Sequence, residues 1–147
     1  MARYVTSVAT PMSAAEAFAF MSDVTRFPQW DPGVVSAVRV AGDGTSVGTA
    51  YDLTISAGGT SVMRYEVRAY EAPHRLLLVA RTSRLASEDE IRVEATPQGA
   101  IVTYDAKLTL SGLLGIFDPF LALAFDRIGD RAAVGLRRAL RGSAVLR

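Results

Sequence analysis

The sequence predicts an α+β fold in which a curved antiparallel sheet surrounds a long C-terminal helix. Between residues 34 and 110, apolar and polar residues alternate in short segments separated by Gly- and Pro-containing turns, which is typical of strands joined as hairpins. Beyond residue 112, apolar residues recur every three or four positions to about residue 141, as on one face of a helix. The chain has 147 residues, half of them hydrophobic, so residues 1–147 are expected to form one domain with its own core.

The first elements are expected to be a strand and two short helices. Residues 2–10 are rich in Val, Thr and Tyr, which favours a strand. Ser13 is a suitable N-cap, and Glu16 three positions later completes a capping box. This pair predicts a helix over residues 14–21. A second, shorter helix is expected near residues 25–29.

Six further strands are expected, at residues 34–40, 49–57, 60–70, 76–82, 88–95 and 101–110. With the first strand they make a sheet of about seven strands. The turns at Gly58-Gly59 and Pro97-Gln98-Gly99 are too short for a crossover connection, so neighbouring strands should pair antiparallel. One face of the sheet is apolar and the other is charged, and the apolar face needs a cover.

The C-terminal helix supplies that cover. Its apolar stripe consists of Leu114, Phe117, Leu121, Phe125, Ile128, Ala132, Leu136 and Leu140. Pro119 lacks an amide proton, so the helix should kink or properly begin there. Gly129 and Gly135 are poor helix formers, and their small size would let the helix approach the sheet closely.

The composition argues against several classes of function. The formal net charge is +1, so no nucleic-acid partner is expected. There is no cysteine and a single histidine, His74, which rules out thiol chemistry and argues against a conventional zinc site; we expect no metal and no cofactor. Residues 113–125 are the most apolar stretch but are too short to span a bilayer, and the N-terminus lacks a signal-peptide pattern. A cytoplasmic monomer or homodimer without an integral membrane span is the expectation.

Two segments carry a resemblance to a known family. These are Trp30-Asp31-Pro32-Gly33-Val34, after the first helices, and Ala72-Pro73-His74-Arg75-Leu76, before the fifth strand. With the order of elements, they resemble the START-like or SRPBCC superfamily, the polyketide cyclase/dehydratase family, over essentially the whole chain. The resemblance implies a helix-grip fold with a deep hydrophobic cavity for lipids, sterols, polyketides or plant hormones. It implies no particular catalytic residue, because no catalytic motif is shared across that family.

The candidate cavity residues follow from which face of the sheet or helix each occupies. We predict that the cavity is lined by Tyr51, Leu53, Met63, Tyr65, Arg81, Tyr104, Leu121 and Phe125. The tyrosines would offer hydroxyl groups to a ligand oxygen. Arg81 lies on a strand that is apolar on both faces, so it points either into the cavity or outward to a surface acid.

Three other residues are candidates for functional groups. Asp89 would point inward if its strand began early enough, and its carboxyl could then act as a general base. The favoured interpretation is instead that residues 87–89 form an exposed turn. His74 and Trp30 are interpreted as structural, His74 as a turn residue and Trp30 as a core or lid anchor.

The leading hypothesis is a binding protein for an apolar small molecule such as a lipid, a polyketide or another hydrophobic metabolite. It rests on the excess of apolar residues and on the lack of a converging acid, base and nucleophile. The alternative is an enzyme of the polyketide cyclase/dehydratase type that works in the same cavity. A scaffold or toxin-type partner protein is a third hypothesis, supported only by the apolar residues 113–125.

Overall fold

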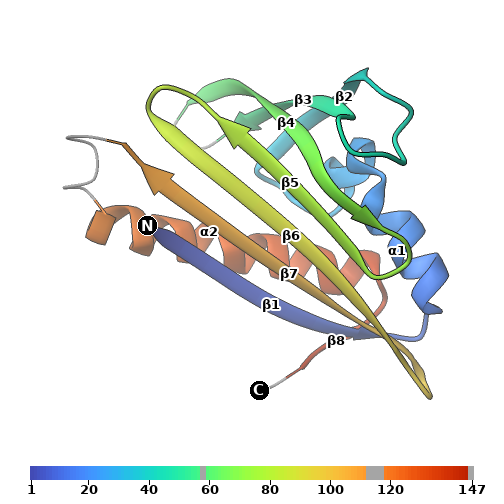
Figure 1. The fold of residues 1–147 in the computed structure, drawn as a ribbon. Helices are drawn as coiled ribbons and strands as arrows, with labels where there is room; N and C mark the ends of the chain where they lie inside the picture. The colour runs from blue at the N-terminus through green and yellow to red at the C-terminus, as the bar shows by residue number, and fades with distance from the viewer. Residues whose placement is uncertain (57–58, 112–117, 146–147) are drawn as a thin grey trace.

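The computed structural model describes residues 1–56, 59–111 and 118–145, with the side chains of the final helix described from Leu123 onward. Two short helices follow the first strand, and a long helix follows the last long strand (Figure 1). The strands are β1 (Ala2–Thr10), β2 (Val34–Ala41), β3 (Ala50–Ser56), β4 (Thr60–Glu71), β5 (Arg75–Arg81), β6 (Leu85–Thr96), β7 (Gly99–Leu110) and β8 (Ser143–Ala144). The helices are α1 (Ala14–Ser22), the 3-10 helix η1 (Val24–Gln29) and α2 (Asp118–Ala139).

The strands form one antiparallel sheet in the order β2-β3-β4-β5-β6-β7-β1-β8. The strands from β2 to β7 are neighbours in sequence and in space, as hairpin connections require. Strand β1 extends the sheet beyond β7 and pairs along its whole length, with Ala2 opposite Leu108 and Thr10 opposite Ala100. This long-range pairing brings the N-terminus beside the start of α2 (Figure 1).

The sequence did not predict strand β8. Arg141 has a positive φ of 51°. A Cβ on Gly142 would overlap the carbonyl oxygen of Ala9, so the missing side chain lets the backbone lie close along β1. The amide of Val145 then donates to the carbonyl of Ser7 at 3.0 Å. A strand of two residues is too short to show any periodicity, so the sheet has eight strands rather than the expected seven.

Ser13 caps the start of α1 as predicted, although Glu16 bonds to the Ser13 hydroxyl and not to its amide as in a full capping box. The Ser13 hydroxyl accepts from the amide of Glu16 at 3.1 Å and donates to its carboxylate at 3.0 Å. Helix α1 buries Ala17, Phe18 and Met21, and its contacts are with β6 and β7. Both short helices therefore lie on the apolar face of the sheet.

Helix α2 lies across that same face, next to β1 (Figure 1). It begins at Asp118, so Pro119 occupies its first turn, where a missing amide proton costs nothing. A Cβ built on Gly129 would overlap the ring of Tyr4, and one built on Gly135 would overlap the carbonyl oxygen of Trp30. Gly129 therefore lets the helix approach the sheet closely, as the sequence predicted, whereas Gly135 lets it approach the segment after η1.

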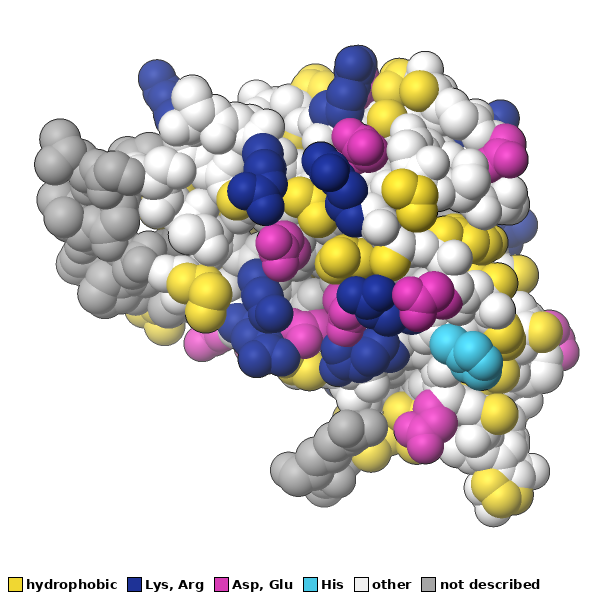
Figure 2. All heavy atoms as spheres, viewed as in Figure 1, with side chains coloured by type: hydrophobic (Ala, Val, Ile, Leu, Met, Phe, Trp, Pro, Cys, Tyr) yellow, Lys and Arg dark blue, Asp and Glu magenta, His cyan; other side chains and the backbone are white. Residues whose placement is uncertain are grey.

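The two faces of the sheet differ as expected. The inner face, beneath α1 and α2, contributes to a core that includes Tyr51, Leu53, Val67, Leu76, Leu78, Ile91, Val93 and Val102. The outer face carries alternating acidic and basic side chains, which Figure 2 shows side by side over the middle of the sheet. No helix in the described part of the chain is long and apolar enough to cross a membrane.

Candidate functional site

Four polar side chains interrupt the apolar inner face. Tyr65 comes from β4, Ser87 and Asp89 from β6, and Tyr104 from β7, and all four are buried. Their positions follow from strand parity, since Ser87 and Asp89 share the inward direction of Ile91 and Val93. We call these four residues the inner polar cluster.

Hydrogen bonds link the cluster across three strands. The Tyr104 hydroxyl donates to Oδ2 of Asp89 at 2.9 Å, and the Ser87 hydroxyl lies 3.5 Å from Oδ1 of the same carboxyl. The hydroxyls of Tyr65 and Ser87 are 2.9 Å apart. Strand β5 runs between these two residues, and Ala80, which pairs with Ser87, is small enough to let the phenol reach across it.

Burial sets the electrostatics of the cluster. Loss of hydration raises the pKa of Asp89 to about 7, against the opposing effect of the hydrogen bond from Tyr104. Burial also raises the pKa of Tyr65 and of Tyr104, and the nearby Asp89 carboxyl adds to both shifts. At neutral pH the cluster therefore contains neutral phenols and a carboxyl that is close to half ionised.

The segment after η1 brings two more groups to the cluster. The indole of Trp30 packs edge-on against the Tyr104 ring at a centroid distance of 5.1 Å and against Phe27 at 4.9 Å. Asp31 accepts a hydrogen bond from the amide of Gly33 at 2.9 Å, and burial raises its pKa. Its charge acts on Asp89 and on both phenols of the cluster.

Most of the predicted cavity residues belong to the core around this cluster. Tyr51, Leu53, Tyr65 and Tyr104 are buried members of it, while Met63 and Phe125 are half-buried and pack against it. Leu121 lies in α2, but its side chain is outside the described residues, as is most of the apolar stretch at residues 113–125. That these residues line one cavity stays a prediction.

Two residues left open by the sequence now have definite orientations. The Arg81 side chain is 67% exposed on the outer face, 3.9 Å from Glu88, so it takes the outward orientation and not a place in the cavity. The interpretation of residues 87–89 as an exposed turn was wrong, because β6 begins at Leu85 and Asp89 is only 8% exposed. Pairing with both β5 and β7 holds this polar stretch in the sheet.

Reasoning from the sequence overlooked Ser87 and Asp31 as members of a site. Ser87 shares its parity with Ile91 and Val93, and this would have placed it on the inner face if the start of the strand had been predicted correctly.

His74 is exposed, with its amide bonded to the Glu71 carbonyl at 2.7 Å, in keeping with a turn residue. Trp30 is buried in the core, and its indole N–H has no hydrogen-bond partner within the described part of the chain.

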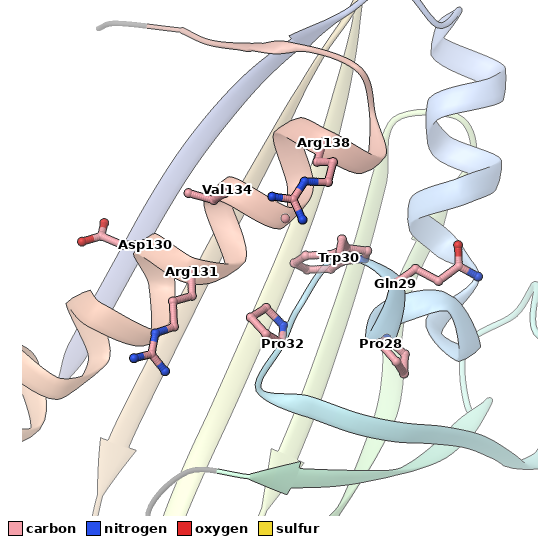
Figure 3. A pocket seen from close by; sticks show the side chains of 9 residues that line it. Pro28, Gln29, Trp30, Pro32, Asp130, Arg131, Val134 and Arg138 are labelled. Atoms are coloured by element: carbon pink, nitrogen blue, oxygen red, sulfur yellow. The ribbon is translucent and has the colours of Figure 1, made fainter.

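A surface groove lies on the other side of Trp30. It has a volume of about 460 Å³ and is lined by Pro28, Gln29, Trp30, Pro32, Asp130, Arg131, Val134, Gly135 and Arg138. In Figure 3 the residues from α2 face those from η1 and the loop after it. A second pocket of about 480 Å³ lies between the ends of β1 and β7 and the C-terminal segment. Neither pocket contains a predicted cavity residue.

The groups of this site can support ligand binding and proton transfer. Among the described residues, no three His, Asp or Glu side chains are grouped so as to hold a metal ion. The inner polar cluster can hydrogen-bond a ligand, and Asp89 can exchange a proton near neutral pH.

Comparison with known proteins identifies the family. A family model described as "Polyketide cyclase / dehydrase and lipid transport" matches residues 1–141. The chain belongs to this family. The family resemblance seen in the sequence is therefore confirmed, while curated proteins gave no match.

Solved structures agree with this family fold. A START superfamily protein from Mycobacterium smegmatis superposes with a TM-score of 0.75 at 16% identity, over 95% of each chain. The protein TTHA0849 from Thermus thermophilus gives a TM-score of 0.71 at 13% identity, over 95% of this chain and 96% of its own. The di-domain ARO/CYC BexL from the BE-7585A biosynthetic pathway gives 0.71 at 13% identity, over 96% of this chain and 50% of its own. At these identities the likeness establishes the fold alone.

Proposed function

We propose that this chain binds an apolar small molecule, such as a lipid, a polyketide or another hydrophobic metabolite, between the sheet and α2. The observation that carries the proposal is the inner polar cluster, a set of hydrogen-bonding groups within an otherwise apolar face. Ligand sites typically combine apolar walls with a few polar groups that orient the ligand. Membership of a family described by lipid transport and polyketide cyclisation supports the same proposal.

The binding site would be the cavity of a helix-grip fold, with the sheet curved around α2. Its walls would be Tyr51, Leu53, Met63, Tyr65, Tyr104, Leu121 and Phe125, without the outward-pointing Arg81. The front half of α2, with Leu121, would cover the cavity. The rear half, with Leu136, packs into closed core, where Leu136 is fully buried.

Substitutions in the two halves of α2 test this arrangement. Leu136→Ala should lower the free energy of unfolding by about 2–5 kcal/mol, because it leaves a hole in packed core. Leu121→Ala should cost clearly less and should change the affinity for Nile red, a neutral apolar dye, because the side chain would border open space. Urea unfolding and dye titration measure the two effects. Equal, large losses of stability with unchanged dye binding would refute a cavity under the front of the helix.

A second candidate function is catalysis in the same cavity, of the polyketide cyclase/dehydratase type. It is favoured by the raised pKa of Asp89, about 7, beside the Tyr104 hydroxyl. The Asp89 carboxylate would take a proton from a carbon next to a carbonyl, and a tyrosine hydroxyl would donate a hydrogen bond to the enolate oxygen. Exchange of that carbon-bound hydrogen for deuterium, followed by NMR with a 1,3-diketone, tests it. Exchange that is no faster with the protein than with its Asp89→Asn variant would exclude this role.

A further inference from the structure

The hydrogen bonds of the inner polar cluster converge on the Asp89 carboxyl. The Tyr104 hydroxyl donates to Oδ2 of Asp89 at 2.9 Å, and the Ser87 hydroxyl lies 3.5 Å from Oδ1. In the 2.9 Å bond between Tyr65 and Ser87 either hydroxyl can be the donor. With Asp89 ionised, its carboxylate oxygens and the oxygens of the two phenols all carry lone pairs that can accept hydrogen bonds from a ligand.

The charge around the cluster has one sign. The charged groups that act most strongly on Asp89 are the carboxyls of Asp31 and Asp105, and those acting on Tyr104 are Asp89 and Asp31. The arginines of the neighbouring strands are turned to the outer face, where Arg64, Arg75 and Arg92 pair with surface carboxylates. Asp105 is itself paired with Arg3, whereas Asp89 and Asp31 have no ion pair among the described residues. A ligand carboxylate would therefore be repelled by Asp89 and Asp31, and a ligand cation would be attracted to them.

Aromatic rings complete the surroundings. Trp30 and Tyr104 meet edge to face at a centroid distance of 5.1 Å, and the Tyr65 phenol reaches the same group of side chains through Ser87. Faces of tryptophan and tyrosine rings attract ammonium groups, more strongly where water is excluded. Acceptor oxygens, acidic groups and aromatic rings thus converge at one place on the inner face.

We propose that the inner polar cluster receives the protonated amine of an otherwise apolar ligand. This inference rests on the proposed function and narrows its ligand to apolar amines. The ammonium group donates hydrogen bonds to the Asp89 carboxylate and to the lone pairs of the phenols, and the apolar part lies along the inner face of the sheet. Binding the cation stabilises ionised Asp89, so a proton leaves Asp89 when the amine binds near neutral pH.

Three ligands of equal chain length test the proposal: decylamine, decanol and decanoic acid, each below its micellar concentration and measured by displacement of Nile red. At pH 8 the amine is protonated and Asp89 is ionised. Decylamine should bind more tightly than decanol, on the order of tenfold, and decanoate should bind most weakly. At pH 5.5, where Asp89 is protonated, the advantage of the amine over the alcohol should shrink.

Asp89→Asn, which keeps the shape but removes the charge, should abolish the preference for decylamine over decanol. Asp52→Asn, on the outer face where Asp52 pairs with Arg64, is the matched control and should keep the preference. Should the Asp89 variant fail to fold, calorimetry of the unaltered protein in buffers of different ionisation enthalpy decides the matter. A fraction of one proton released per decylamine at pH 7 supports the proposal, and no release contradicts it.

The outcomes separate this inference from the proposed function. Tighter or equal binding of decanol or decanoate would overturn the assignment to amines while leaving an apolar binding site in place. Failure of all three ligands and of the dye to bind would overturn both.

Discussion

At the scale of single residues, two aspartates on neighbouring strands have opposite environments. Asp89 on β6 points to the inner face, where burial raises its pKa to about 7. Asp105 on β7 points to the outer face, where Arg3 donates hydrogen bonds of 3.0 and 2.7 Å to its two oxygens. The Arg3 guanidinium lowers the pKa of Asp105. The pKa of Asp89 therefore rises because the carboxyl loses hydration without gaining a cation, and the pKa of Asp105 falls because an arginine pairs with it.

Asp89 should make the protein less stable as the pH rises from about 4 to about 7. In the unfolded chain Asp89 loses its proton near pH 4, whereas in the folded protein it keeps the proton up to its raised pKa. The contribution of Asp89 to stability is therefore fully present below pH 4 and is lost between about pH 4 and about pH 7. The loss should be on the order of 4 kcal/mol. Urea unfolding at a series of pH values measures it. Asp89→Asn should flatten the profile in this range, and an equally steep profile in the variant would assign the effect to another group.

At the scale of elements, the position of α2 depends on its two glycines. Gly135 faces the backbone of Trp30, and a Cβ there would overlap the Trp30 carbonyl oxygen. The helix backbone therefore presses on the segment that carries Trp30 and Asp31 toward the inner polar cluster. Trp30 and Gly135 also line the surface groove of Figure 3.

Gly135→Ala should destabilise the protein even though alanine favours helix formation by about 1 kcal/mol. The added methyl group forces α2 away from Trp30, and overpacking of this kind costs about 1–3 kcal/mol. Thermal unfolding measures the stability, and the tryptophan fluorescence of Trp30, the single tryptophan, reports the shift of its surroundings. Val134→Ala, at an exposed neighbouring position, is the control for stability and should change it little. A stabilised Gly135→Ala variant would mean that the contact is loose.

At the scale of the whole molecule, a row of charges crosses the outer face of the sheet. It connects β1, β7, β6, β5 and β4 through Arg3, Asp105, Arg92, Glu90, Arg75 and Glu71. One carboxylate of this row, Asp105, has a side chain that is only 4% exposed, which is unusual for an outer face. The row joins the N-terminal strand to strands that lie far from it in sequence.

Arg3→Gln should raise the pKa of Asp105 and lower stability at neutral pH. A carboxyl with a lowered folded pKa contributes stability above its unfolded pKa and loses it as the pH falls through the folded value. The variant should therefore differ from the unaltered protein at pH 7 and converge with it at strongly acidic pH, as seen by urea unfolding. Arg64→Gln removes the more exposed pair with Asp52 and should have little effect, because exposed ion pairs contribute little. Equal effects of the two substitutions would contradict a special role for Asp105.

The sequence by itself determined the two faces of the sheet and every helix and strand except β8. Period-two alternation placed Tyr51, Tyr65 and Tyr104 on the inner face, and the capping box located the start of α1, because both signals depend on neighbouring residues in the chain. The early start of β6 escaped this reasoning. Its polar residues are typical of a turn, and only pairing with β5 and β7 makes them a strand.

Only the tertiary structure decided which polar groups meet. Tyr65 reaches Ser87 across the small Ala80 of an intervening strand, and Trp30 meets Tyr104 with its ring while its backbone lies against Gly135 of α2. The same packing determined that Asp89 is buried and Arg81 exposed. The alternation of apolar and polar residues is a local property, and it specifies only which face of the sheet each side chain occupies. The register of distant strands and the approach of a helix depend on packing summed over the whole core, which no short segment of the sequence encodes.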